Sequence, residues 1–99
     1  MINRIVRMTF DAAQTARFVA VFDASKEYIR NFEGCMHLEL WQDAADPCVY
    51  YTFSKWQSEE HLNGYRASTL FKQTWAQTKP LFAEKAQAWT INPLQSVTS

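Results

Sequence analysis

The sequence contains little glycine, proline or cysteine. Its 99 residues include 2 glycines, 3 prolines and 2 cysteines. This composition excludes a collagen-like or low-complexity chain, and no apolar run reaches the ~18 residues that suggest a membrane-spanning helix. The first seven residues alternate apolar and polar side chains, unlike a signal peptide. We therefore expect a cytoplasmic protein with no membrane partner and reduced cysteines.

The sequence also lacks an excess of charge of either sign. Lys+Arg 10 balance Asp+Glu 10, and the basic residues are scattered along the chain. Nucleic-acid binding requires a clustered basic surface, so we expect no nucleic-acid partner. The sequence also has no phosphate-binding glycine loop, no nucleophile-elbow motif and no cluster of metal ligands. We expect no metal.

Apolar and aromatic residues are plentiful, at 47% and 15% of the chain. Apolar surface of this amount can offset the chain entropy of one folded domain, and 99 residues are too few for two domains. We expect one domain over residues 1–93, followed by a C-terminal tail over 94–99. So many aromatic side chains predict a cavity or a contact with a partner chain.

Hydrophobic periodicity predicts the elements of this domain. A strand over 2–10 is followed by a helix to about residue 32, with a capping box of Asp11 and Gln14 at its start and a left-handed Gly34 after its end.

Strands over 35–42 and 48–56 come next, with Trp56 assigned to packing at the end of the second. A two-part helical region with N-caps at Ser58 and Ser68 follows, and a strand over 87–92 ends the domain. The order β-α-β-β-α-β predicts an α+β fold of the ferredoxin-like type, with helices on one face of an antiparallel sheet.

The hairpin over 35–56 determines which residues face the helices. If Trp41 lies opposite Cys48, then Met36 and Leu38 lie opposite Phe53 and Tyr51 on one apolar face. The other face then carries Cys35, His37, Glu39, Trp41, Tyr50, Thr52, Ser54 and Trp56. Because water-facing sheets rarely display so many aromatics, we expect a homodimer in which a second copy covers this face. The alternative is an ordinary solvated face.

Three segments resemble the antibiotic biosynthesis monooxygenase superfamily. They are Phe32-Glu33-Gly34-Cys35, the run from Trp56 to Leu62 (WQSEEHL), and Ser68-Thr69-Leu70-Phe71-Lys72. The resemblance implies a dimeric α+β barrel with a pocket between sheet and helices in each protomer. It also implies oxygenation of quinols or polycyclic aromatics without metal or flavin. Haem-degrading relatives have Asn, Trp and His where an ungapped comparison places Arg7, Tyr65 and Trp75, so we expect no haem degradation.

Two polar residues are candidates for catalysis. His37 is the only strand histidine, and histidine is the side chain whose ordinary pKa lies nearest neutrality, so His37 is the candidate base. The alternative is a histidine held at the dimer contact by Glu39 or Thr52. Arg7 is the candidate for holding an anionic substrate, and the alternative is an exposed or ion-paired arginine. His61 follows two glutamates and is expected to be solvated.

Aromatic residues are the candidates for binding a substrate, and the alternative is that they form plain core. The set that we expect to wall a pocket on the helix side of the sheet is Tyr51, Phe53, Tyr65, Phe71 and Trp75. Together these features predict a cofactor-independent monooxygenase that acts on a quinol or polycyclic aromatic molecule. The competing prediction is a non-catalytic small-molecule-binding or dimerisation module on the same fold.

Overall fold

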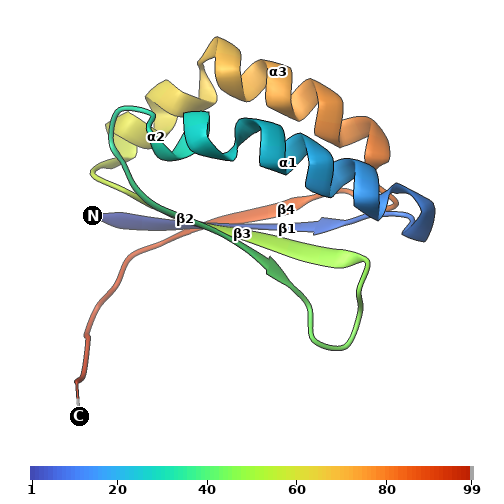
Figure 1. Cartoon of the computed structure of the whole chain (residues 1–99). Coiled ribbons are helices and arrows are strands. Elements are labelled where there is room, and N and C mark those ends of the chain that lie inside the picture. Colours follow the sequence, from blue (N-terminus) through green and yellow to red (C-terminus); the bar gives the residue numbers. More distant parts are fainter. Residues whose placement is uncertain (99) are drawn as a thin grey trace.

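Three α-helices cover one face of a four-stranded antiparallel sheet in the computed structural model, which describes residues 1–98 (Figure 1). The strands are β1 (Ile2–Thr9), β2 (Cys35–Gln42), β3 (Val49–Trp56) and β4 (Gln87–Ile91), in the order β2-β3-β1-β4. The helices are α1 (Thr15–Arg30), α2 (Glu59–Arg66) and α3 (Thr69–Thr78), and 3-10 turns span Ala12–Gln14 and Lys79–Leu81. The predicted ferredoxin-like α+β fold is confirmed. Of the predicted tail, Ser99 lies outside the described residues.

Serine side chains begin the second and third helices, as predicted. Ser58 Oγ accepts a hydrogen bond from the backbone N–H of His61 at 3.2 Å, and Ser68 Oγ accepts one from Phe71 at 3.1 Å. The predicted capping box before α1 is wrong, because the Asp11 side chain makes no capping hydrogen bond. The Asp11 carbonyl instead accepts from the Gln14 N–H at 2.8 Å and closes a 3-10 turn.

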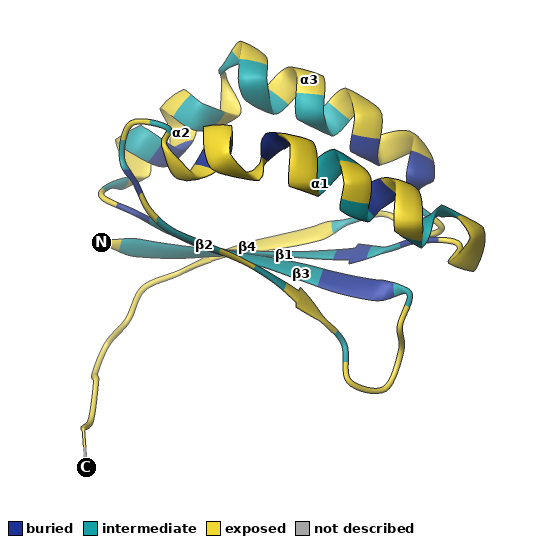
Figure 2. Ribbon diagram, in the orientation of Figure 1, coloured by how far each residue is buried: buried dark blue, intermediate teal, exposed yellow. Residues whose placement is uncertain are grey.

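The core lies between the helices and the sheet (Figure 2). One buried cluster contains Met8, Phe10, Phe18, Tyr50 and Leu81, and a second contains Cys35, Trp56 and Leu62. Trp56 is 1% exposed and donates to Ser54 Oγ at 3.0 Å, so the assignment of Trp56 to packing is confirmed.

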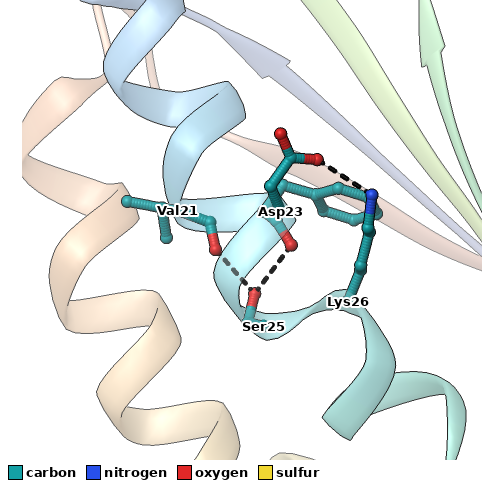
Figure 3. Close-up of polar contacts among 5 residues, drawn as sticks. Val21, Asp23, Ser25 and Lys26 are labelled. Carbon is teal, nitrogen blue, oxygen red and sulfur yellow. Dashed lines mark hydrogen bonds and ion pairs between the residues drawn. The ribbon is translucent and has the colours of Figure 1, made fainter.

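Helix α1 also buries one polar side chain, Ser25, whose hydroxyl donates to the Val21 carbonyl at 2.9 Å (Figure 3). Lys26 and Asp23 form an exposed ion pair beside it. Within residues 1–98, no helix is both long and apolar enough to cross a membrane.

The predicted register of the β2–β3 hairpin is wrong. Trp41 pairs with Tyr51 rather than Cys48, and Leu38 pairs with Ser54. The loop between the strands is longer than expected, and within it Asp43 Oδ2 accepts from the amides of Ala45 and Asp46, at 3.0 and 2.9 Å. A β-bulge between Cys35 and His37 shifts the register again at the far end of β2.

This shift exchanges the two faces of β3, because an odd change of register turns every side chain over. Tyr50, Thr52, Ser54 and Trp56 face the helices, while Tyr51 and Phe53 face away from them. Cys35 also lies on the helix side, packed with Trp56. For residues 37–42 of β2 the prediction was correct, with Leu38 toward the helices and His37, Glu39 and Trp41 on the open face, the side of the sheet away from the helices. It was wrong for the first two residues of β2, Cys35 and Met36, which precede or lie in the bulge, and Met36 is 46% exposed.

Candidate functional site

A cavity of about 310 Å³ lies between the sheet and the three helices. Strands β1 and β3 contribute Arg4, Val6, Met8, Thr52, Ser54 and Trp56 to its lining. Helices α2 and α3 contribute Tyr65, Arg66, Phe71 and Trp75. Arg66 and Ala88 are exposed members of the lining, so the cavity opens between the end of α2 and the edge strand β4.

Aromatic rings form a continuous wall of this cavity. Tyr65 stacks on Trp56 with ring centroids 4.9 Å apart and meets Phe71 edge-on at 5.3 Å. Phe71 and Trp75 stack at 5.8 Å with an interplanar angle of 10°. Such a wall presents ring faces and edges that match a planar aromatic ligand. Of the predicted substrate-binding residues, Tyr65, Phe71 and Trp75 therefore lie on the expected side of the sheet.

Tyr65 is the polar group within the aromatic wall. Burial raises the pKa of Tyr65 to about 12, with a smaller contribution from Cys35. The phenol is therefore neutral at physiological pH and can donate a hydrogen bond. Tyr65 lines the cavity, and among the described residues its hydroxyl makes no hydrogen bond.

Two arginines give the cavity a positive charge. Arg4 is half-buried and donates from Nη1 to Thr90 Oγ1 at 2.9 Å. Burial lowers the pKa of Arg4, and repulsion by the Arg66 guanidinium lowers it further. Among the described residues that line the cavity, none is Asp, Glu, His or Lys.

The remaining site candidates lie on the open face of the sheet. Arg7 pairs with Tyr51 across β1 and β3, and its Nε donates to the Tyr51 hydroxyl at 3.3 Å. That hydrogen bond raises the pKa of Arg7. Phe53 stacks on Trp41 at 5.0 Å and contacts the His37 ring at 5.9 Å. The placement of Tyr51 and Phe53 in a helix-side pocket was therefore wrong.

His37 is part of a small polar network on that face. Its Nε2 contacts Glu39 Oε2, and Glu39 Oε1 accepts from Trp41 Nε1 at 2.9 Å. The Trp41 hydrogen bond, together with the contact to His37, lowers the pKa of Glu39. Thr52, the other predicted partner of His37, faces the helices instead.

The sheet thus separates the predicted site residues into two groups. One group lies at the cavity and consists of Tyr65, Phe71 and Trp75. The other lies on the open face and consists of Arg7, His37, Tyr51 and Phe53.

Sequence reasoning missed two cavity residues, Arg4 and Arg66. Arg4 could have been found, because it shares the two-residue period of Val6 and Met8, which face the helices. Residues 1–98 contain no group of three or more His, Cys, Asp or Glu side chains placed to hold a metal ion.

His61 does not have the solvated position that was predicted for it. Its Nδ1 lies 2.6 Å from Ser58 Oγ, and its ring packs against Gly34. A hydrogen placed at the glycine Cα leaves room for that ring, whereas a side chain would not.

Comparisons with known proteins identify relatives of this fold. Residues 1–77 match the family model described as antibiotic biosynthesis monooxygenase. Rv0793 from Mycobacterium tuberculosis is 21% identical with a TM-score of 0.88, covering 98% of each chain. A conserved protein from Methanosarcina mazei Go1 is 16% identical with a TM-score of 0.86, covering 90% of this chain and 88% of that one.

A third solved structure, described as an antibiotic biosynthesis monooxygenase, is 14% identical with a TM-score of 0.89. The match covers 96% of this chain and 100% of that one. Likeness at these identities shows the fold alone. A search of the curated proteins finds none that matches the chain.

Proposed function

The chain belongs to the antibiotic biosynthesis monooxygenase family, and on this premise we propose that it is a cofactor-independent monooxygenase acting on a quinol or polycyclic aromatic molecule. The observation that carries the proposal is the cavity walled by Trp56, Tyr65, Phe71 and Trp75. Its volume of about 310 Å³ falls at the lower end of the range for small-molecule sites, ~300–1,000 Å³.

The chemistry requires an electron-rich substrate anion and a site with little water. An anthrone illustrates the balance: its CH₂ group loses a proton, the carbanion passes electrons to O₂, and a carbon–oxygen bond forms. Cleavage of the O–O bond then yields the quinone carbonyl and one water. The protein supplies a desolvated pocket and a donor for the developing oxyanion.

We assign the substrate contact to Tyr65, Phe71 and Trp75. The ring faces hold the planar substrate, and the neutral Tyr65 hydroxyl donates to the substrate oxygen that gains negative charge. His37 and Arg7 face the opposite side of the sheet from these groups. With no His, Asp, Glu or Lys among the described lining residues, the substrate proton passes to water at the open side, which favours substrates whose anion is stabilised by an aromatic system.

The same observation supports a second candidate function. A cavity lined without a general base also suits a non-catalytic module that binds a small aromatic molecule. The two functions differ in whether O₂ is consumed.

We also propose that the protein is a homodimer joined through the open face. This face carries Trp41, Phe53, Trp89 and Ile91, of which Trp41, Trp89 and Ile91 are 40%, 43% and 46% exposed. A second copy would bury these side chains together with the network of His37 and Glu39.

Oxygen uptake tests the proposed reaction. Wild-type protein incubated with anthrone should consume one O₂ for each anthraquinone formed, and Tyr65→Phe should slow turnover by about a hundredfold by removing one oxyanion donor. Tyr28→Phe is the matched control, because Tyr28 is 69% exposed on α1. Binding of anthrone without oxygen uptake would support the binding module, and a fully active Tyr65→Phe would contradict the role of Tyr65.

A further inference from the structure

Arg4 and Arg66 reach the cavity without a carboxylate to neutralise them. Ion pairs among the described residues join Lys26 to Asp23 and His37 to Glu39, and neither cavity arginine takes part in one. The described lining contains no Asp or Glu. The cavity therefore combines an aromatic wall with uncompensated positive charge.

Stabilisation of the fold accounts for the position of only one of these two arginines. Arg66 lies in the last turn of α2, where a cation interacts favourably with the helix dipole. That position does not account for Arg4, which comes from β1 and lines the same cavity. The hydroxyl of Thr90 satisfies one donor of the Arg4 guanidinium and leaves its charge unpaired.

Two like charges at one cavity oppose each other. Arg4 and Arg66 both line this cavity, and repulsion by the Arg66 guanidinium adds to the effect of burial in lowering the pKa of Arg4. An anion bound in the cavity near both groups would reduce this repulsion. Guanidinium groups match the planar geometry of a carboxylate better than that of a spherical anion.

We propose that the cavity takes an aromatic acid, whose carboxylate binds Arg4 and Arg66 while its ring lies against Tyr65, Phe71 and Trp75. This inference rests on the proposed function only in using the same cavity as the substrate site. The cavity volume of about 310 Å³ lies within the range of small-molecule sites and admits a small fused-ring ligand. Arg66, being exposed at the open side, meets the carboxylate as it enters, and the half-buried Arg4 holds it inside.

Binding of two matched probes tests the inference. We expect 2-naphthoate to bind at least about tenfold more tightly than its neutral counterpart 2-naphthamide, because a charge-assisted hydrogen bond to a desolvated carboxylate corresponds to a factor of this size. Calorimetric titration at low and high salt measures both affinities, and only that of 2-naphthoate should fall with salt.

Substitutions then locate the anion. Arg4→Gln and Arg66→Gln should each weaken 2-naphthoate binding by about tenfold and leave 2-naphthamide binding unchanged. Arg66→Glu, at an exposed position, should weaken 2-naphthoate binding further by charge reversal. Arg17→Gln is the matched control, since Arg17 is exposed on α1 and does not line the cavity.

The two proposals fail in different ways. Equal affinity for 2-naphthoate and 2-naphthamide, or a loss of 2-naphthoate binding no greater in Arg66→Glu than in Arg17→Gln, would overturn the anion site even if anthrone is oxidised. Arginine-dependent binding of 2-naphthoate without oxygen uptake from any aromatic substrate would support the anion site and reject the monooxygenase.

Discussion

At the residue scale, Gly34 lies in the connection from α1 to β2 and contacts the residues at the start of α2. Gly34 has φ of +88°, its carbonyl accepts from the Gln57 N–H at 2.8 Å, and the His61 ring occupies the space beside its Cα. A side chain here would adopt a left-handed conformation and displace that ring.

Gly34→Ala should therefore lower the free energy of unfolding by about 2 kcal/mol or more. Gly64→Ala is the matched control in α2: its new Cβ would meet nothing within 4 Å, so it should raise stability by about 0.5–1 kcal/mol. Urea unfolding measures both. Equal effects of the two substitutions would contradict the role assigned to Gly34.

Tyr65 makes stability sensitive to alkaline pH. Its pKa rises from 10 in the unfolded chain to about 12 in the folded protein, so the unfolded state loses this proton first. The contribution of the buried Tyr65 phenol to the free energy of unfolding is complete below pH 10. It declines by about 1.4 kcal/mol per pH unit between pH 10 and 12. Unfolding of wild type and Tyr65→Phe at pH 9 and 11 should show a smaller pH-dependent loss in the variant. Parallel losses would contradict burial of this phenol.

Sequence rules for helix caps and turns correctly predicted the roles of residues that depend only on their neighbours in the chain. The caps at Ser58 and Ser68 and the left-handed Gly34 follow from side-chain and backbone chemistry within one turn. The environment of His61 could not be predicted this way, because Gly34 lies 27 positions away in the sequence and meets it only through the fold.

At the element scale, the β2–β3 hairpin determines which side chains enter the cavity. Sequence pattern alone did not fix its register, because aromatic residues on both faces of β3 made either assignment look apolar. Tyr51 and Phe53 were placed inward, whereas Thr52, Ser54 and Trp56 line the cavity. The observed loop is closed by hydrogen bonds to Asp43, which a count of turn-forming residues does not reveal.

Asp43 should therefore stabilise the hairpin loop. Asp43→Ala removes two hydrogen bonds to backbone amides and should lower the free energy of unfolding by about 1 kcal/mol. Asp43→Asn keeps an acceptor oxygen at the same position and should retain most of that stability. Thermal unfolding of the two variants compares them, and equal destabilisation would show that the negative charge matters rather than the acceptor.

At the scale of the whole molecule, element order and the short motifs at the helix junctions sufficed to predict the fold and the family, since both depend on features spread over most of the chain.

The aromatic side chains of the open face lead to a prediction about the assembly of the protein. Phe53→Glu places a charge beside Trp41 and should convert the proposed dimer to monomer. Tyr28→Glu is the control on α1. Sedimentation that finds monomers for the wild type, or dimers for Phe53→Glu, would contradict this interface.

The central claim is that the cavity between the sheet and the helices is the substrate site, and filling that cavity tests the claim most directly. Ala88 lines the cavity at its open side, whereas Ala76 is exposed on α3 outside it. Oxygen uptake with anthrone should fall at least about tenfold in Ala88→Phe through steric exclusion of the substrate, and Ala76→Phe and His37→Ala should remain active. An active Ala88→Phe beside an inactive His37→Ala would place the chemistry on the open face and contradict the account.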